Sequence, residues 1–123
     1  MSTVMFERFL NELHEPGSVN LSPSRLAEKM AVQIQDLAVS AGVHRNTIRT
    51  HPESPRLQGF LRDVVRVMSA ASVSQPDAAS AAFWVKNTPI PSFRHKTAYQ
   101  LVAEGRTDDV VSYLESIQSG YVG

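Results

Sequence analysis

The chain has 123 residues, with 12 lysines and arginines, 12 aspartates and glutamates, and no cysteine. Without cysteine there is no disulfide, no thiolate zinc site and no cysteine nucleophile, and a reducing cytosol is the expected location. Because the formal net charge is zero, any contact with nucleic acid must come from a local basic patch. The length predicts one compact unit, or two small lobes that share a core.

No membrane-spanning or targeting segment is predicted. No apolar run approaches the roughly 20 residues of a membrane span, and acidic residues occur near the N-terminus, where a signal peptide would be basic. We therefore expect a cytoplasmic protein that is neither membrane-bound nor processed.

Two helices are predicted in the first 30 residues. Apolar side chains recur at helical spacing from Met5 to Leu13, and the Pro-Gly pair at 16–17 marks the end of the first helix. Ser22 and Pro23 begin the second helix, because serine caps free N–H groups and proline at the first helical position has its φ already set.

Residues 35–51 carry the spacing of a helix-turn-helix. Ala38 is small, Gly42 follows four residues later, and Ile48 follows six residues after that. Two steeply crossing helices need a small residue where they touch, the sharp turn favours glycine, and the second helix must return a branched apolar side chain to the core. The second helix then begins near His44. Its outward side chains are His44, Arg45, Asn46, Arg49 and Thr50.

We expect these five side chains to bind DNA, because arginine pairs with guanine or phosphate and asparagine pairs with adenine. An ordinary helical hairpin with a polar exposed face is the alternative interpretation. Asp36, Glu53 and the neutral total charge weigh against binding by a single copy. We therefore expect a homodimer that places two such helices about one DNA turn apart.

The C-terminal half predicts four further helices. Ser54 and Pro55 begin a long helix with an apolar stripe, and residues 76–86 form an alanine-rich helix. Prolines make the loop over 87–96 extended, since a residue before proline favours β or polyproline geometry. A short helix stops at Gly105. The last helix is expected to have Thr107 as its N-cap and a buried side of Val110, Val111, Leu114 and Ile117.

No segment shows the sustained alternation of a strand, so the sequence predicts an all-α fold. No nucleophile arrangement or glycine-rich phosphate loop is present, and the four histidines lack the spacing of metal ligands. We therefore expect no enzymatic activity, no catalytic residue, no metal and no cofactor.

A combination of features in the C-terminal half carries a resemblance to a known family. The features are the aromatic pair Phe83 and Trp84, Asn87 with Pro89 and Pro91, the helix start Lys96-Thr97, the break from Leu101 to Gly105, and the tail from Gly120 to Gly123. Together they resemble antitoxins of the Xre/MbcA/ParS type from bacterial toxin-antitoxin pairs. The resemblance covers about the last 70 residues closely and the helix-turn-helix more loosely. One departure is Arg94-His95, where the family commonly has glycines before the lysine.

The resemblance implies a protein with two functional regions. Residues 1–54 would form the helix-turn-helix DNA-binding region and residues 55–123 a small helical toxin-binding region. The partner would be a RES-domain toxin that acts on NAD or ADP-ribose, and the chain would repress its own operon by binding operator DNA. Members are usually dimeric through their N-terminal helices. The expected toxin-binding residues are Trp84, Asn87, Phe93, Arg94, Lys96, Tyr121, Val122 and Gly123.

Alternatives remain open for several of these residues. Trp84 and Phe93 have a core role as their alternative, because an aromatic at the end of a helix often seals the next turn. The apolar tail residues Tyr121 and Val122 either enter the toxin's nucleotide pocket or, for Tyr121, pack back against Ile117. For the whole chain, the alternatives are a stand-alone transcription regulator without a toxin, and an interaction protein that has lost DNA binding.

Overall fold

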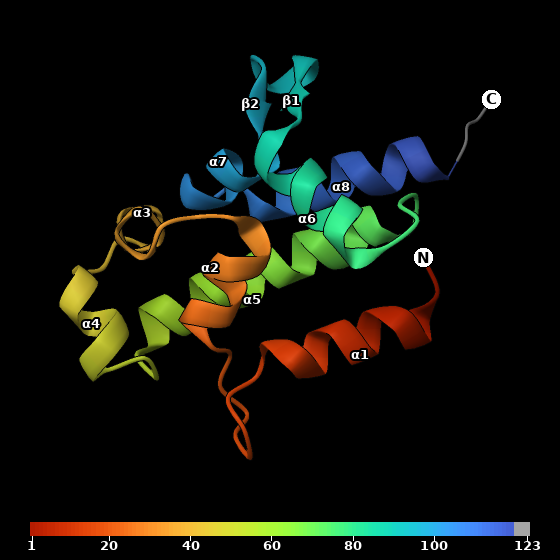
Figure 1. Cartoon of the computed structure of the whole chain (residues 1–123). Helices are drawn as coiled ribbons and strands as arrows, with labels where there is room; N and C mark the ends of the chain where they lie inside the picture. Colours follow the sequence, from red (N-terminus) through yellow and green to blue (C-terminus); the bar gives the residue numbers. More distant parts are fainter. Residues whose placement is uncertain (120–123) are drawn as a thin grey trace.

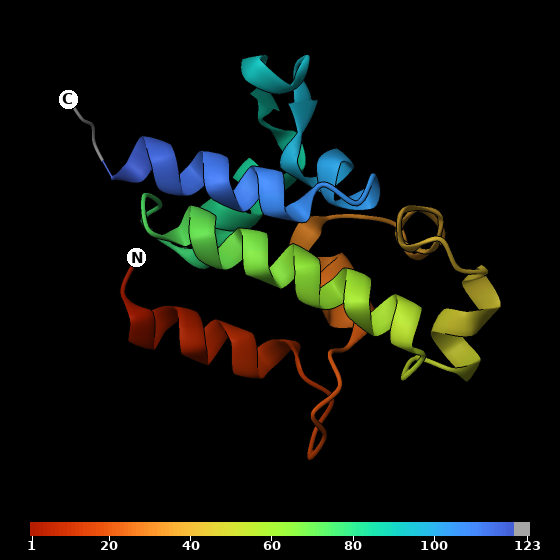
Figure 2. The ribbon, with the colours of Figure 1, turned by 180° about the vertical axis from the view of Figure 1, so that it is seen from behind.

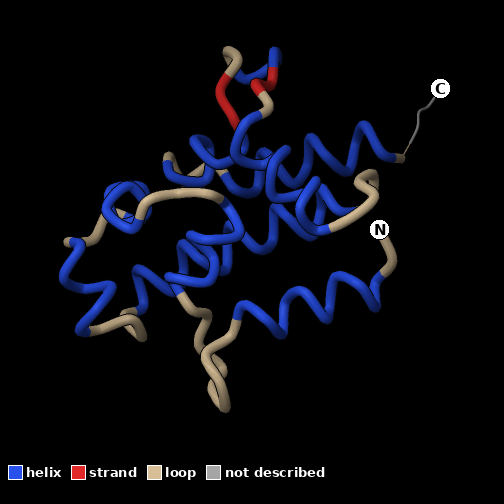
Figure 3. Tube along the Cα trace, in the orientation of Figure 1, coloured by secondary structure: helices blue, strands red, loops and turns tan. Residues whose placement is uncertain are grey.

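The computed structural model describes residues 1–119, and within them the fold is helical (Figures 1 and 3). The N-terminal elements are α1 (Thr3–Leu13), α2 (Pro23–Met30), α3 (Ile34–Ala41) and α4 (Arg45–Thr50). The C-terminal elements are α5 (Pro55–Ser72), α6 (Ala78–Asn87), β1 (Pro89–Ile90), the 3₁₀ helix η1 (Pro91–Phe93), β2 (Lys96–Thr97), α7 (Ala98–Ala103) and α8 (Thr107–Gln118). None of the helices in this part of the chain has both the length and the apolar character needed to cross a membrane.

Helix α5 is the central element of the fold. Figure 2 shows it running between α8 on one side and α1 on the other, and it also packs against α3, α6 and α7. The predicted apolar stripe of α5 is confirmed: Leu57, Phe60, Leu61, Val64, Met68 and Ala71 are all buried. Because this one helix touches both halves of the chain, it joins their apolar faces.

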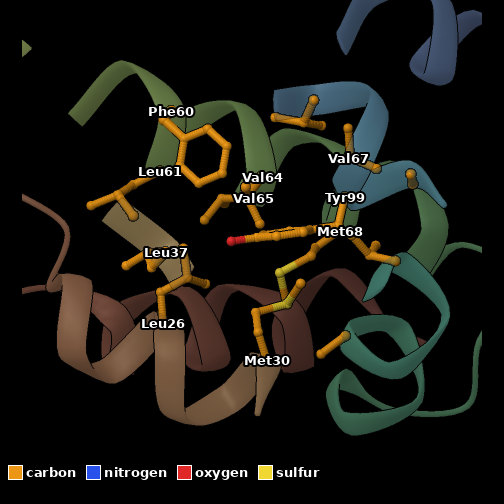
Figure 4. Packing of buried hydrophobic residues seen from close by; sticks show 14 of the residues in the cluster. Leu26, Met30, Leu37, Phe60, Leu61, Val64, Val65, Val67, Met68 and Tyr99 are labelled. Atoms are coloured by element: carbon orange, nitrogen blue, oxygen red, sulfur yellow. The ribbon is translucent and has the colours of Figure 1, made fainter. Parts of the chain in front are cut away.

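The buried apolar residues form one continuous cluster from α1 to α8. Figure 4 shows Leu26 of α2, Leu37 of α3 and Leu61 of α5 close together, with the ring of Tyr99 from α7 pointing into the same cluster. Residues from both halves of the chain therefore share one core, and neither half buries its apolar face alone.

Local capping chemistry sets the helix starts that the sequence predicted. The hydroxyl of Ser22 accepts a hydrogen bond from the N–H of Arg25 at 3.2 Å, and the hydroxyl of Ser54 accepts one from the N–H of Leu57 at 3.4 Å. Each serine precedes a proline at the first helical position. Both predicted starts are confirmed.

One buried amide ties two loops to α5. Gln58 is only 3% exposed. Its Oε1 accepts from the N–H of Leu21 at 2.9 Å, and its Nε2 donates to the carbonyls of Leu21 at 2.9 Å and Pro52 at 2.8 Å. The segment before α2 and the segment after α4 are thereby held on the same residue.

Predictions for the C-terminal half are wrong in part. Thr88 and Ile90, which precede prolines, are extended as expected. Residues 87–96 are nevertheless not one extended loop, because Asn87 ends α6, Pro91–Phe93 form η1, and β1 pairs antiparallel with β2. Thr107 is the first residue of α8 and is buried, while Arg106 occupies the N-cap position. Ile117 is 55% exposed, while its neighbour Gln118 faces α5 and donates to the carbonyl of Ala70 at 2.9 Å.

Candidate functional site

In the segment from α3 to α4, the residues that set the predicted spacing lie in the core and at the turn. Ala38 and Ile48 are buried, and Gly42 ends α3 in the left-handed conformation with φ of 71°. The N–H of Val43 then donates to the carbonyl of Ala38 at 3.0 Å, which closes the turn. As a result α4 begins at Arg45 with one side in the core and the other in solvent.

Two of the five predicted DNA-binding side chains are engaged with α4 itself. His44 is the N-cap of α4, and its Nδ1 accepts from the N–H of Asn46 at 3.1 Å. The hydroxyl of Thr50 donates to the carbonyl of Asn46 at 2.7 Å. Both side chains are exposed, and their present bonds stabilise the helix ends.

The other three, Arg45, Asn46 and Arg49, lie on one exposed face of α4. Within residues 1–119 neither arginine forms an ion pair. The three side chains line a shallow hollow of about 340 Å³ beside the start of α3. Their donors are therefore available to a ligand that approaches this face.

Sequence reasoning missed two polar residues at this hollow. Gln33 and Gln35 line it from the start of α3, opposite the arginines of α4. Gln33 is the N-cap of α3, and its side chain makes no capping hydrogen bond. Their positions in the sequence could have indicated this role. Gln33 directly precedes α3 and Gln35 lies in its first turn, and the starts of α3 and α4 face the same side.

The α6 residues among the predicted toxin-binding set differ in exposure. Trp84 is half-buried and packs against the core cluster, whereas Asn87 is exposed and its Nδ2 donates to the carbonyl of Phe83 at 3.2 Å. Phe83 is 67% exposed and was not among the predicted site residues. The two neighbouring aromatic rings therefore differ, because the Trp84 ring packs against the core and the Phe83 ring is in solvent.

The hairpin of β1, η1 and β2 stands out from the helices (Figure 1). At its tip Phe93 packs edge-on against Tyr113 of α8, with ring centroids 5.7 Å apart. The guanidinium of Arg106 lies 5.1 Å from the centre of the Phe93 ring. Phe93 therefore attaches the hairpin tip to the helical body.

The basic residues of the hairpin also differ from one another. Lys96 is paired with Glu104, with 2.6 Å between Nζ and Oε2. Arg94 is exposed and forms no ion pair within residues 1–119. Arg94 and His95 both have positive φ, 57° and 64°. The remaining predicted residues, Tyr121, Val122 and Gly123, lie outside the described part of the chain.

A larger cavity of about 830 Å³ lies elsewhere, over α5 between α1 and α8. None of the predicted site residues lines it. In the described part of the chain, no three histidine, aspartate or glutamate side chains are grouped closely enough to hold a metal ion. The two exposed polar surfaces, at α3–α4 and at the hairpin, are the regions where the structure brings predicted site residues together.

No family model, no curated protein and no solved structure matches this chain.

Proposed function

We propose that this protein is an antitoxin of the Xre/MbcA/ParS type. In this proposal α3 and α4 form a helix-turn-helix that binds operator DNA as a homodimer and represses the protein's own operon. The C-terminal region binds and neutralises a RES-domain toxin that acts on NAD or ADP-ribose.

The observation that carries the proposal is the exposed face of α4. Ala38 and Ile48 are buried and Gly42 forms the turn, while Arg45, Asn46 and Arg49 are exposed, with no ion pair to any other residue of the described range 1–119. Buried contacts on one side and free guanidinium and amide groups on the other suit insertion into a major groove.

Backbone conformation in the hairpin supports the resemblance that suggested the toxin. Arg94 and His95 stand where the family commonly has glycines, and both adopt left-handed φ values. Glycine adopts this conformation without steric cost, whereas other residues do so at a cost of about 1–2 kcal/mol. The chain therefore keeps the backbone geometry that glycines would favour, although it has larger side chains there.

A double substitution tests the DNA-binding half of the proposal. Arg45→Ala with Arg49→Ala should weaken binding to duplex DNA from directly upstream of the gene by about 100-fold, because each arginine contributes about 1–3 kcal/mol to base or phosphate recognition. The control is Arg62→Ala, which removes an exposed arginine of α5 that forms no ion pair within the described residues. Unchanged affinity in the double variant, measured by electrophoretic mobility shift, would contradict DNA binding by α4.

Co-expression tests the toxin-binding half. A RES-type protein encoded beside this chain should form a stable complex with it in a pull-down, and growth should be rescued. Arg94→Glu at the exposed hairpin tip should reduce rescue, whereas Arg62→Glu on α5 should not. A neighbouring RES protein that neither binds nor is neutralised would contradict this half of the proposal.

One observation favours a second candidate function, a stand-alone helix-turn-helix transcription regulator without a toxin. Phe93 and Lys96, two of the residues expected to contact toxin, are engaged inside the chain with Tyr113 and Glu104. In that case the C-terminal region stabilises the fold or mediates self-association. Operator binding without any complex with a RES protein would select this function.

A further inference from the structure

Arg56 occupies a position that the dipole of its own helix does not favour. It is the second residue of α5, after Ser54 as N-cap and Pro55 at the first position. The start of a helix carries partial positive charge, so an arginine there is mildly repelled. The first turn of α5 contains no acidic residue to offset this charge. The side chain therefore has its favourable partner outside α5.

That partner is the end of α3. Nη1 of Arg56 donates a hydrogen bond to the carbonyl oxygen of Gly42 at 3.3 Å, across 14 positions of sequence. Gly42 is the C-cap of α3. Carbonyl groups at a helix end lack partners within the helix and carry partial negative charge, so a guanidinium is favourable there.

The turn leaves room for this contact. A Cβ added at Gly42 would stand 3.1 Å from Nη1 of Arg56, which is tighter than nearly all real Cβ contacts. Gly42 thus suits the turn through its φ of 71°, and any larger residue there would also displace the end of the Arg56 side chain by a few tenths of an ångström. A second glycine with positive φ is Gly105, and a Cβ added there would have no neighbouring atom within 4 Å.

We propose that Arg56 is a positioning residue that holds the turn between α3 and α4 and so sets the direction in which α4 presents Arg45 and Arg49. The proposal rests on the proposed DNA-binding function. Helix α4 is short, and only Val43 and His44 separate it from Gly42. Fixing the carbonyl of Gly42 therefore fixes the start of α4. Arg56 acts through these residues and is not itself a phosphate contact.

The test compares Arg56→Ala, Arg56→Lys and the control Arg62→Ala, with duplex DNA from upstream of the gene as the probe. Each phosphate contact that is lost lowers the slope of log affinity against log salt by about one. We expect Arg56→Ala to weaken binding about fivefold with an unchanged salt slope. Arg56→Lys should restore most of the affinity, because an ammonium group can donate to the same carbonyl. Arg62→Ala should match the parent protein.

Amide hydrogen exchange supplies a readout that does not need DNA. Arg56→Ala should speed exchange over residues 43–50 while α6 and α8 stay as protected as in the parent protein. A salt slope lowered by about one in Arg56→Ala would show a direct phosphate contact and overturn the positioning role. Unchanged exchange over 43–50 would overturn it as well. If the parent protein binds no duplex, the proposed DNA-binding function fails, and exchange alone then decides the role of Arg56.

Discussion

The α3–α4 segment and the β1–β2 hairpin both expose basic side chains from short elements, but they are stabilised differently. The turn between α3 and α4 is held by backbone hydrogen bonds, a left-handed glycine and buried apolar side chains. The hairpin is held by two paired strands and by side-chain contacts of Phe93 and Lys96. On α4, three of the five predicted contacts, Arg45, Asn46 and Arg49, have no side-chain partner within residues 1–119, whereas on the hairpin Phe93 and Lys96 are engaged inside the chain. Substitutions in each region can test this difference.

The largest effect is expected at Gln58, which holds the segment after α4. Gln58→Leu leaves the N–H of Leu21 and the carbonyl of Pro52 without their buried partner. We expect the free energy of unfolding to fall by about 3 kcal/mol, because each unsatisfied buried polar group costs about 1–3 kcal/mol. Urea denaturation measures it. A loss below about 1 kcal/mol would mean that water replaces the amide.

A pair of glycines with positive φ compares the α3–α4 turn with the turn between α7 and α8, which follows the hairpin. Gly42→Ala should cost about 2 kcal/mol, since its positive φ is unfavourable for alanine and the new Cβ meets Arg56. Gly105→Ala near the start of α8 should cost about 1 kcal/mol, because only the φ is unfavourable there. Thermal unfolding of the two variants gives the comparison. Equal losses of stability in the two variants would show that the contact of the new Cβ with Arg56 does not destabilise the turn.

The attachment of the hairpin is tested at Phe93. Phe93→Ala removes the edge-on contact with Tyr113 and the cation–π contact with Arg106, and should cost about 1–2 kcal/mol. Phe83→Ala is the control, because this ring is 67% exposed and its loss should change stability by less than about 0.5 kcal/mol. Chemical denaturation of both variants measures the two losses in the free energy of unfolding. A similar cost at both positions would show that the hairpin is not held by Phe93.

Left-handed positions after α2 and in the hairpin offer a gain in stability. Ala31, which follows α2, has φ of 55°, and Arg94 in the hairpin has φ of 57°. Ala31→Gly and Arg94→Gly should each raise the free energy of unfolding by about 0.5 kcal/mol. On the proposed function, Arg94→Gly should also weaken toxin binding, whereas Ala31→Gly should not. A decrease in stability at either site would contradict the backbone argument.

The smallest effect concerns pH and the N-cap of α6. A hydrogen bond from the N–H of Ser80 holds the pKa of Asp77, the N-cap of α6, below its ordinary value. This contribution to stability is present above the pKa of the unfolded chain and is lost as pH falls through the lower pKa of the folded protein. Asp77→Asn keeps an acceptor but does not titrate, so the variant should lose less stability than the parent below about pH 4. Identical acid profiles would contradict this.

Local chemistry explains which elements the sequence could predict. Ser22 and Ser54 begin helices because serine and the following proline act within one turn, and the Ala38, Gly42 and Ile48 spacing constrains a contact between neighbours in sequence. These signals need no knowledge of the rest of the fold. The core face of α5 was predictable for the same reason, since its apolar period is regular.

The errors lie where contacts between distant segments decide the structure. The hairpin depends on pairing Pro89 with Thr97 and on left-handed φ values at two residues that are not glycine, and no local pattern predicts either feature. The exposure of Ile117 depends on which side of the last turn of α8 faces α5, and Gln118 takes that side. Likewise Gln33 and Gln35 belong to the α4 hollow only because α3 and α4 cross there.

On the proposed function, the six-residue length of α4 limits the number of base pairs that one copy of the protein can contact. At a rise of about 1.5 Å per residue the helix is about 9 Å long, which spans about three base pairs at about 3.4 Å each. A given sequence of three base pairs occurs by chance about once in every 64 base pairs, so a genome contains a very large number of equivalent sites. The spacing between two bound copies must therefore contribute as much to operator specificity as the base contacts do.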